Sequence, residues 1–415
     1  MATDKDNYNP RIVNNDPAFM SAELERVGAQ WPGQQIISRK ATFLPIRLER
    51  LSCVAANVLK QEMLARGGDC AVHKDCVTLE REESLVLLIG TRPQYEDLIA
   101  KLRQQGFGLP AIATQLSDLL ANLDTPRKPF QAGPYTLPLG ERTLVMGVIN
   151  VTPDSFSGDG LGSDLEAAIS QAHRMKEEGA DLLDIGGQST RPGSDPIPIE
   201  EELRRVIPLI ETLAAPGGLP LPISIDTNRA EVAEAAIKAG AHIINDISGL
   251  RDDPAIAEVA AKYGAGLALM HIQGTPRTMQ QDPHYDDLLG EVIQYLRQSI
   301  DKALACGVKK ERIWVDPGIG FGKTQAHNLE LLKRLGELKS LGCPILVGTS
   351  RKGFIGRILA QSLGGESPPP QERVIGTGAT VALSIANGAD VVRVHDVAHM
   401  VQVVRIADAI VRLKL

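Results

Sequence analysis

Between residues 144 and 396, eight short apolar runs each end in a polar turn. Runs of this length, rich in β-branched and aliphatic residues, are typical of strands buried on both faces of a parallel sheet. The runs span residues 144–150, 180–187, 221–227, 242–249, 266–272, 312–318, 344–350 and 390–396. We predict one strand in each run.

Segments with the apolar spacing of amphipathic helices separate these runs and follow the last one. They span residues 165–179, 200–214, 229–240, 254–263, 285–306, 328–341, 373–388 and 397–413. Eight strands alternating with eight helices over roughly 250 residues match the usual size of a TIM barrel. The predicted fold class is therefore α/β, a (β/α)8 TIM barrel. A doubly wound open sheet is less favoured, because its dinucleotide-binding glycine pattern is absent after the first strand.

The chain has 415 residues, which is more than one barrel requires, so a second domain is expected. In the small domain, residues 51–66 and 94–105 are predicted as helices and residues 84–89 as a strand. The predicted parts are a polar N-terminal segment (1–35), a small α/β domain of unknown role (36–123), a linker with a barrel-closing hairpin (124–142) and the barrel (143–415).

Composition excludes several classes of protein. The net charge is -7 with both signs interspersed, so no basic stripe indicates binding to nucleic acid. No apolar stretch is long enough for a signal peptide or a membrane span. Five scattered cysteines, an odd number, argue against a disulfide framework. We therefore expect a soluble, cytoplasmic protein.

Two local patterns resemble known sites but match them poorly. Cys70, His73 and Cys76 have a spacing that could ligate a metal, with Cys53 as a fourth ligand, yet the paired CxxC of a zinc site is missing. Residues 318–324 (GIGFGKT) resemble a phosphate loop, but its first glycine would fall at Pro317. Ordinary core and surface roles are the simpler interpretation of both patterns.

The ends of the first two predicted strands carry polar residues that suit a phosphorylated ligand. Asn150 ends the first strand and offers a neutral oxygen, which suits Mg2+ bound alongside phosphate oxygens and water. Thr190 and Arg191 lie in a loop rich in Pro and Gly, where the arginine could clamp a phosphate or a carboxylate. The alternatives are that Asn150 only caps its strand and that Arg191 is a solvated surface residue.

Acids and an amide gather at the ends of the third, fourth and sixth predicted strands. These residues are Asp226, Asn245, Asp246 and Asp316. Several carboxylates at one end of a barrel repel each other and are costly to desolvate, so a ligand that presents N–H donors would stabilise them. This pattern predicts a pterin-like or purine-like ring inside the barrel. Alternatively, Thr227 or Asp246 caps a helix.

Met270 and Phe321 are apolar residues near strand ends that could contact the flat ring. Packing in the core explains each of them equally well.

The last two predicted strands supply cationic and hydrogen-bonding groups. Ser350, Arg351 and Lys352 follow the seventh strand, and Arg393 and His395 alternate on the eighth, so the latter two point to the same side. Loops after these two strands often bind phosphate in this fold. A diphosphate site is therefore predicted here, although His395 alone could be an ordinary strand-end histidine.

The ordered motifs NVTPDSFS, GGQSTRPGS, SIDT, ND, DPGIGFGK, TSRKGFIG and RVHD resemble dihydropteroate synthase over about residues 143–415. The resemblance implies an enzyme, a transferase that joins 6-hydroxymethyl-7,8-dihydropterin diphosphate to p-aminobenzoate and releases pyrophosphate in folate biosynthesis. It also implies Mg2+ as cofactor, inhibition by sulfonamides, and a homodimer.

Residue roles are carried over motif by motif from this resemblance. It assigns the catalytic role to Asp226, Lys352, Arg393 and His395, and pterin binding to Asp226, Asn245, Met270, Asp316, Phe321 and Lys352. It assigns diphosphate binding to Asn150, Thr190, Arg393 and His395, and p-aminobenzoate binding to Thr190, Arg191, Pro192, Ser350 and Lys352. Asn150 is the implied metal ligand.

Two positions depart from the family pattern. The first loop reads SFSGDG rather than SFSDGG, which moves the acid to Asp159, and Gln188 replaces a glutamate in the second loop. Two other functions stay open at this point. One is a methyltransferase that passes a methyl group from methyltetrahydrofolate to a corrinoid protein, and the other is a pterin-binding protein without catalysis.

Overall fold

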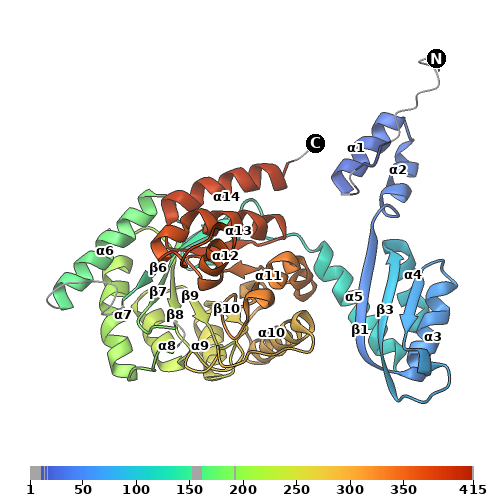
Figure 1. Ribbon diagram of the computed structural model, residues 1–415, viewed down its shortest axis with the longest axis horizontal. Coiled ribbons are helices and arrows are strands. Elements are labelled where there is room, and N and C mark those ends of the chain that lie inside the picture. The colour runs from blue at the N-terminus through green and yellow to red at the C-terminus, as the bar shows by residue number, and fades with distance from the viewer. Residues whose placement is uncertain (1–10, 14, 16, 152–160, 191–192, 414–415) are drawn as a thin grey trace. The chain divides into compact units, whose positions relative to one another are not determined.

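The computed structural model describes residues 11–13, 15, 17–151, 161–190 and 193–413. The chain divides into two compact units, and the boundary between them follows Ala121. The first unit contains the small domain and the second contains the barrel (Figure 1).

The first unit contains a three-stranded antiparallel sheet with β3 in the centre. Its strands are β1 (Phe43–Ser52), β2 (Asp69–Val72) and β3 (Glu83–Thr91), and its helices are α1 (Pro17–Val27), α2 (Trp31–Ser38), α3 (Cys53–Leu64), α4 (Arg92–Leu102) and α5 (Leu109–Asp124). Ser52 ends β1 and also caps α3, because its Oγ accepts a hydrogen bond from the N–H of Ala55 at 3.2 Å. The helix therefore begins at Cys53 rather than at Leu51.

The cysteines of the first unit do not form the metal site considered from the sequence. Cys53 Sγ lies 2.8 Å from Cys76 Sγ, and both residues are buried. The Nδ1 atom of His73 accepts a hydrogen bond from the N–H of Asp75 at 3.3 Å. In the part of the chain that the structure describes, no three His, Cys, Asp or Glu side chains are grouped as metal ligands.

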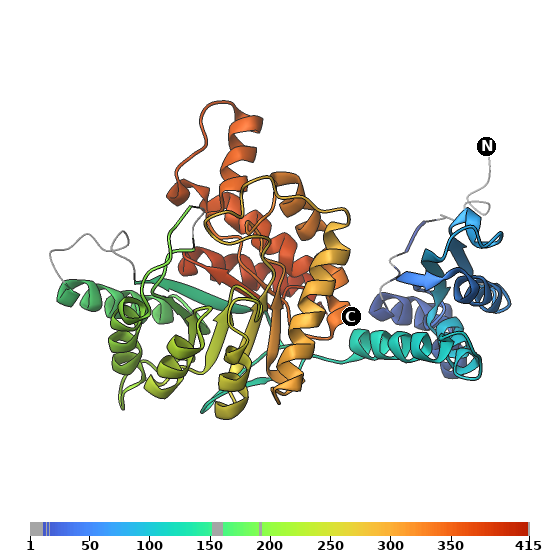
Figure 2. The ribbon, with the colours of Figure 1, turned by 90° about the horizontal axis from the view of Figure 1, so that it is seen from below.

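The second unit contains a sheet of eight parallel strands, and the TIM barrel prediction is confirmed (Figures 1 and 2). Strands β6 to β11 pair in sequence order, β6 also pairs with β13, and β13 pairs with β12. A bridge between Val315 and Ile345 closes the ring. The strands are β6 (Leu144–Asn150), β7 (Leu182–Gly186), β8 (Ile223–Asp226), β9 (Ile243–Asp246), β10 (Gly266–Met270), β11 (Ile313–Asp316), β12 (Leu346–Val347) and β13 (Val391–Val394).

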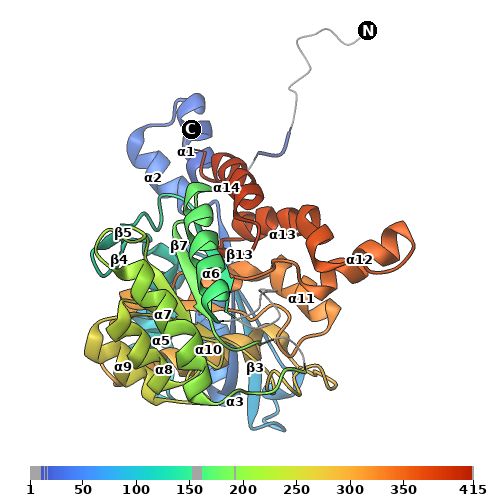
Figure 3. The same ribbon diagram turned by 90° about the vertical axis from the view of Figure 1, so that its left-hand side faces the viewer.

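Helices lie outside the strands, as Figure 3 shows from another side. They are α6 (Leu161–Glu177), α7 (Ile199–Ala214), α8 (Ala230–Ala239), α9 (Ala255–Tyr263), α10 (Leu288–Ala305), α11 (Gln325–Lys333), α12 (Gly353–Leu363), α13 (Val374–Ala386) and α14 (Val397–Val411). The single helix predicted over residues 328–341 is wrong in two respects. Its first part begins earlier, because Thr324 caps α11, and its second part is a 3-10 helix, Leu335–Leu341. Helix α12 was not predicted.

The helices bury their apolar faces against the barrel in one large cluster. None of the described helices is long and apolar enough to cross a membrane. A hairpin of β4 (Phe130–Ala132) and β5 (Tyr135–Leu137) contributes to a second cluster inside the barrel. This cluster includes Leu144, Leu182 and Val391, which are the first residues of their strands. The hairpin therefore covers the N-terminal end of the barrel and leaves the carboxyl ends of the strands to form a mouth.

Candidate active site

The polar residues predicted from the sequence lie at the carboxyl ends of the barrel strands. Asn150, Asp226 and Asp316 are the last residues of β6, β8 and β11. Asn245 is the last residue but one of β9, and Asp226, Asn245 and Asp316 are all buried. Side chains alternate between the two faces of a strand, so these positions turn polar groups towards the barrel interior rather than towards the outer helices.

One partly buried arginine joins polar residues from three other strands. Arg393 on β13 donates from Nε to Asp184 Oδ2 at 2.6 Å and from Nη2 to Asp226 Oδ2 at 2.7 Å. Asn245 Nδ2 also donates to Asp184 Oδ2, at 3.0 Å. Buried ions are retained when they are paired and hydrogen-bonded. Asp184 is paired through Oδ2, whereas its buried Oδ1 has no hydrogen-bond partner among the described residues.

Asp184 is the functional residue that sequence reasoning missed. It lies inside the apolar run that forms β7 and is completely buried. The available signal was an acid within such a run, because a carboxylate in that position needs a cationic partner. The partner is Arg393, 209 residues later in the sequence, so the pair could not be recognised without the fold.

Burial controls the charge of this cluster. It raises the pKa of Asp226 to about 7, an effect that Arg393 opposes and Asp184 reinforces. Burial lowers the pKa of Arg393, but Asp184 and Asp226 outweigh it and raise that pKa above its usual range. Asp226 is thus poised to change charge near neutral pH while the arginine stays protonated.

A second acid and a lysine come from the end of β11 and from the segment after β12. Asp316 Oδ1 accepts a hydrogen bond from the N–H of Gly318 at 2.7 Å, and burial raises its pKa to about 6. Lys352 precedes α12, and its Nζ lies 4.1 Å from the ring centroid of Phe321. Burial and, to a lesser degree, the nearby Arg393 lower the lysine pKa to about 8, against the opposing effect of Asp316 and Asp226.

Apolar side chains supply a wall beside these polar groups. Met270 and Phe321 are buried in one cluster with Ile247, Ile272 and Met279. Packing in the core is therefore confirmed for Met270 and Phe321, and their contact with a flat ring stays a prediction. The stacked position of Lys352 on Phe321 places the aromatic ring close to the site.

Ser350 and His395 are linked across the loops after β12 and β13. Ser350 Oγ accepts a hydrogen bond from the N–H of His395 at 3.1 Å and lies 3.0 Å from its Nδ1. Burial lowers the pKa of His395 to about 3, and the nearby Arg393 contributes to this shift. The histidine is therefore neutral in the free protein, and its ring offers one donor and one acceptor.

Part of the predicted p-aminobenzoate site lies outside the described residues. This applies to Arg191 and Pro192. Asp159 of the first loop, which departs from the family pattern, also lies outside the described residues. Thr190 is described and is partly buried. Gln188, which stands where the family pattern has a glutamate, accepts a weak hydrogen bond from the N–H of Ile197 at 3.4 Å.

The proposed capping roles of Thr227 and Asp246 are wrong. Thr227 Oγ1 donates to Glu202 Oε1 at 2.8 Å and caps no helix. Asp246 accepts hydrogen bonds from the backbone of Ser248 and Leu250, at 2.7 and 2.6 Å, and so stabilises the turn that follows β9. Neither residue belongs to the cluster around Arg393.

A buried lysine in the GIGFGKT segment was also unassigned from the sequence. Lys323 Nζ lies 2.9 Å from His271 Nδ1 and donates to the carbonyl oxygen of Phe321 at 3.0 Å. Burial lowers the pKa of this lysine to about 7. The contact ties the loop after β11, which carries Phe321, to the end of β10.

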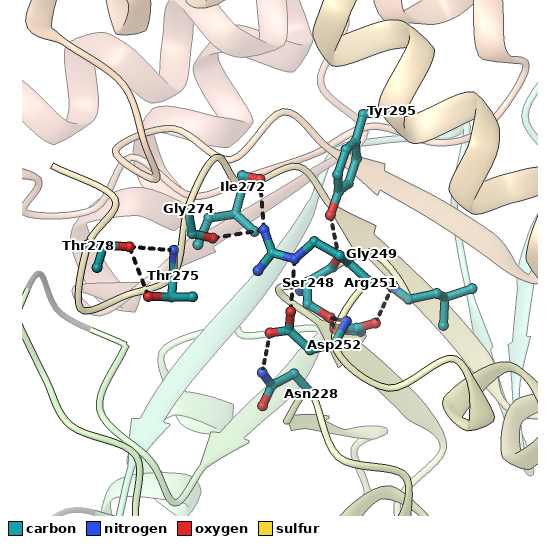
Figure 4. A network of polar contacts seen from close by, with 12 residues as sticks. Asn228, Ser248, Gly249, Arg251, Asp252, Ile272, Gly274, Thr275, Thr278 and Tyr295 are labelled. Carbon is teal, nitrogen blue, oxygen red and sulfur yellow. Dashed lines mark hydrogen bonds and ion pairs between the residues drawn. The ribbon is translucent and has the colours of Figure 1, made fainter. Parts of the chain in front are cut away.

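The loops after β8, β9 and β10 are joined by a polar network, which Figure 4 shows. Arg251 Nη1 donates to the carbonyl oxygens of Ile272 and Gly274, at 3.4 and 2.8 Å, and its Nε donates to Asp252 at 2.8 Å. Asn228 Nδ2 also donates to Asp252, at 2.8 Å. A cavity of about 490 Å3 lies among these loops and the loop after β7, lined by residues such as Gln188 and Thr275. The network therefore fixes one wall of the mouth.

Taken together, the site can bind a flat, nitrogen-rich ring that carries an anionic group. Asp226, Asn245 and Asp316 provide acceptors for N–H donors, and Lys352 and Arg393 provide positive charge nearby. The neutral His395 and Ser350 add hydrogen-bonding groups beside the cations.

Comparisons with known proteins agree with this chemistry. A family model described as "Pterin binding enzyme" matches residues 146–395. A dihydropteroate synthase of Synechocystis is 52% identical over 284 residues, which cover 68% of this chain and 96% of that protein.

Solved structures give the same result for the barrel. A Xanthomonas albilineans dihydropteroate synthase with 4-aminobenzoic acid is 43% identical and has a TM-score of 0.63. The match covers 70% of this chain and 100% of the Xanthomonas chain. A Yersinia pestis dihydropteroate synthase in complex with a sulfonamide drug is 43% identical and has a TM-score of 0.64. The match covers 69% of this chain and 100% of the Yersinia chain.

Proposed function

The chain belongs to the pterin-binding enzyme family, and from this premise we infer that it is a dihydropteroate synthase. Such an enzyme condenses 6-hydroxymethyl-7,8-dihydropterin diphosphate with p-aminobenzoate to give 7,8-dihydropteroate and pyrophosphate. The observation that carries this conclusion is the group of buried acceptors at the barrel mouth, Asp226, Asn245 and Asp316, beside Arg393 and Lys352.

The pterin ring is assigned to the interior end of the mouth. Asp226, Asn245 and Asp316 would accept hydrogen bonds from its N–H groups, and Lys352 would donate to its oxygen or ring nitrogen. Met270 and Phe321 would pack against its faces. Support comes from the burial of the three acceptors and from their common position at strand ends.

The diphosphate is assigned to the side of the mouth formed by β6, β7 and β13. Asn150, Thr190, Arg393 and His395 would hold it, the histidine as a neutral hydrogen-bond donor. A Ser350 hydroxyl that donates to His395 Nδ1 would leave the proton on Nε2, where it can reach a phosphate oxygen.

Mg2+ fits the residues on this side. The ion prefers oxygen ligands and keeps several waters, and Asn150 offers an amide oxygen next to the place assigned to the phosphates. When bound, the ion would neutralise charge on the diphosphate leaving group.

The protein contributes position and charge to the reaction. As the bond to diphosphate breaks, the exocyclic carbon becomes cationic, and an ionised Asp226 stabilises it while Arg393 and His395 receive the leaving group. The amino nitrogen of p-aminobenzoate then attacks that carbon, and the resulting anilinium nitrogen loses one proton to solvent or to the released pyrophosphate. Thr190, Arg191, Pro192, Ser350 and Lys352 would border this second substrate. An arylamine is weakly basic, so the site has no need of a strong general base.

We also propose a cytoplasmic homodimer. Helices α13 and α14 pack against each other and expose large apolar side chains, including Ile375, Leu383, Ile406 and Ile410. An exposed apolar surface of this kind is typical of a protein interface. Light scattering of the purified protein after gel filtration tests the dimer, and charged substitutions at Ile375 and Ile410 should give a monomer.

A binding experiment separates the proposed reaction from methyl transfer. Calorimetry should detect the dihydropterin diphosphate with tighter binding in Mg2+ than in EDTA. Binding of methyltetrahydrofolate with no response to diphosphate or Mg2+ would contradict the proposed function and favour a methyltransferase.

A further inference from the structure

One oxygen atom of Asp184 accepts two hydrogen bonds from two different strands. The side chain is completely buried on β7, and its Oδ2 receives Arg393 Nε at 2.6 Å and Asn245 Nδ2 at 3.0 Å. Both donors belong to residues assigned to the substrates. Asp184 touches neither substrate in this assignment, so its influence must pass through its two partners.

The contact with Asn245 has a chemical consequence. The two ends of an asparagine amide have nearly the same shape, but one donates hydrogen bonds and the other accepts them. An ionised carboxylate can only accept, so it requires the NH2 end of Asn245 to face it. The carbonyl oxygen of Asn245 is then held as an acceptor at the substrate side.

The contact between Asp184 and Arg393 holds the arginine side chain, which comes from β13, in one orientation. Arg393 engages Asp184 through Nε and Asp226 through Nη2, so two carboxylates from adjacent strands set the plane of the guanidinium group. A planar fork held at two points has little freedom to turn. Asp184 Oδ2 thus positions both the Asn245 amide, whose oxygen is assigned to the ring, and the guanidinium group of Arg393.

We propose that Asp184 is a positioning residue that sets the orientation of the Asn245 amide and thereby selects a ring with an N–H donor at that point. This inference rests on the proposed function. It assigns Asp184 a role in selectivity between heterocycles, beyond its contribution to folding.

The substitution that tests this idea is Asp184→Asn. It keeps the shape of the side chain, but an amide can pair with either end of Asn245, so both orientations become available. Ser224→Ala is the matched control. Ser224 is the register partner of Asp184 on β8 and is equally buried, but it has no hydrogen bond to Asn245 or Arg393 among the described contacts.

The readout is ring selectivity, measured by calorimetry with two probes and without turnover. Pterin carries a 2-amino group, which donates hydrogen bonds, and lumazine carries an oxygen in its place. We expect the wild-type protein to prefer pterin by at least about tenfold, the ratio set by one well-made hydrogen bond. Asp184→Asn should reduce the preference to about twofold or less, and Ser224→Ala should keep it.

A second readout is the pH profile of turnover. Asp226 is faced by Arg393, Asp184, Glu202, Asp246 and Lys352, so Asp184→Asn removes one like charge from its surroundings. The acid limb of the profile should therefore move to lower pH. Ser224→Ala, which removes no charge, should leave that limb in place.

Retained selectivity in a folded Asp184→Asn protein would overturn the proposal. If this variant fails to fold, Asn245→Ala provides the decision, because the pterin preference must then fall, and an unchanged preference would equally overturn the role of the amide. A wild-type protein that binds neither ring would instead contradict the proposed function. The two failures are therefore distinguishable.

Discussion

Arg351 and Asp396 form a two-point ion pair between the loops that follow β12 and β13, with Nε to Oδ2 at 2.9 Å and Nη2 to Oδ1 at 2.5 Å. Arg351 holds a left-handed backbone conformation with φ of 59°, which is uncommon for a residue other than glycine. Its N–H donates to Thr377 Oγ1 at 3.1 Å, and its carbonyl oxygen accepts from Arg373 at 3.0 Å. The pair thus turns the arginine side chain towards Asp396, between Ser350 and Lys352, the two residues that are assigned to the substrates in the proposed function.

Arg351→Ala should lower kcat/KM, because Ser350 and Lys352 lose the anchor between them. Losing a hydrogen bond to a charged group costs about 1.5–3 kcal/mol. If the whole cost falls on substrate binding and catalysis, kcat/KM should drop roughly 10- to 100-fold. Steady-state kinetics with both substrates measures it. Arg334→Ala removes a two-point pair with Glu337 on the surface and should leave kcat/KM unchanged. Equal kinetics for the two variants would contradict the anchoring role.

Arg393→Ala should abolish activity and destabilise the barrel. It leaves Asp184 and Asp226 buried without their cation, a change that costs about 3–5 kcal/mol in comparable buried pairs. Urea unfolding measures the stability, and product formation measures the activity. Arg393→Lys keeps the charge but lacks the planar fork, so it should recover part of the stability and little of the activity. Full activity of Arg393→Lys would show that charge alone is sufficient.

Stability should depend on pH through Asp226. Burial raises its pKa from 3.8 to about 7, so between these values the folded state holds a proton that the unfolded state has released. This contribution to stability is complete below pH 3.8 and is lost as pH rises through 7. Asp226→Asn should therefore stabilise the ligand-free protein at pH 8 relative to pH 5, by a few kcal/mol or less.

Thermal or urea unfolding at the two pH values tests this sign. Asp286→Asn is the control, because Asp286 is almost fully exposed, at 98% of its side chain. An Asp226→Asn protein with the same pH dependence as the wild type would show that Asp226 titrates as an ordinary acid.

The barrel unit should keep catalytic activity without the small domain. Every residue assigned to the site lies after the boundary at Ala121, and so does the hairpin of β4 and β5. A protein that starts at residue 122 should therefore retain kcat/KM within about threefold, a margin in line with ordinary surface changes. Removal of the hairpin as well, by a start at residue 141, uncovers Trp314 and the first residues of the strands and should give an insoluble or inactive protein.

The sequence predicted the barrel well because the signal for it is local. Each strand is a short apolar run followed by a turn, and the run over residues 144–150 coincides with β6. Asp226, Asn245 and Asp316 were placed correctly because they end such runs.

The remaining features depend on contacts between distant residues. Asp184 lies within an apolar run, and its role can be inferred only from its ion pair with Arg393, which lies 209 residues later in the sequence. No capping residue in the sequence marks the start of α12, because Lys352, which precedes the helix, makes no capping hydrogen bond with its side chain. The charge of His395 was also not evident from its position beside Arg393, because burial, not spacing, makes it neutral.

The most direct test of the central claim is pyrophosphate release by the purified protein supplied with dihydropterin diphosphate, with and without p-aminobenzoate, in Mg2+ and in EDTA. The account predicts release that is coupled one to one with dihydropteroate formation and that requires both p-aminobenzoate and the metal. Binding of the pterin with no dihydropteroate under any of these conditions would contradict it.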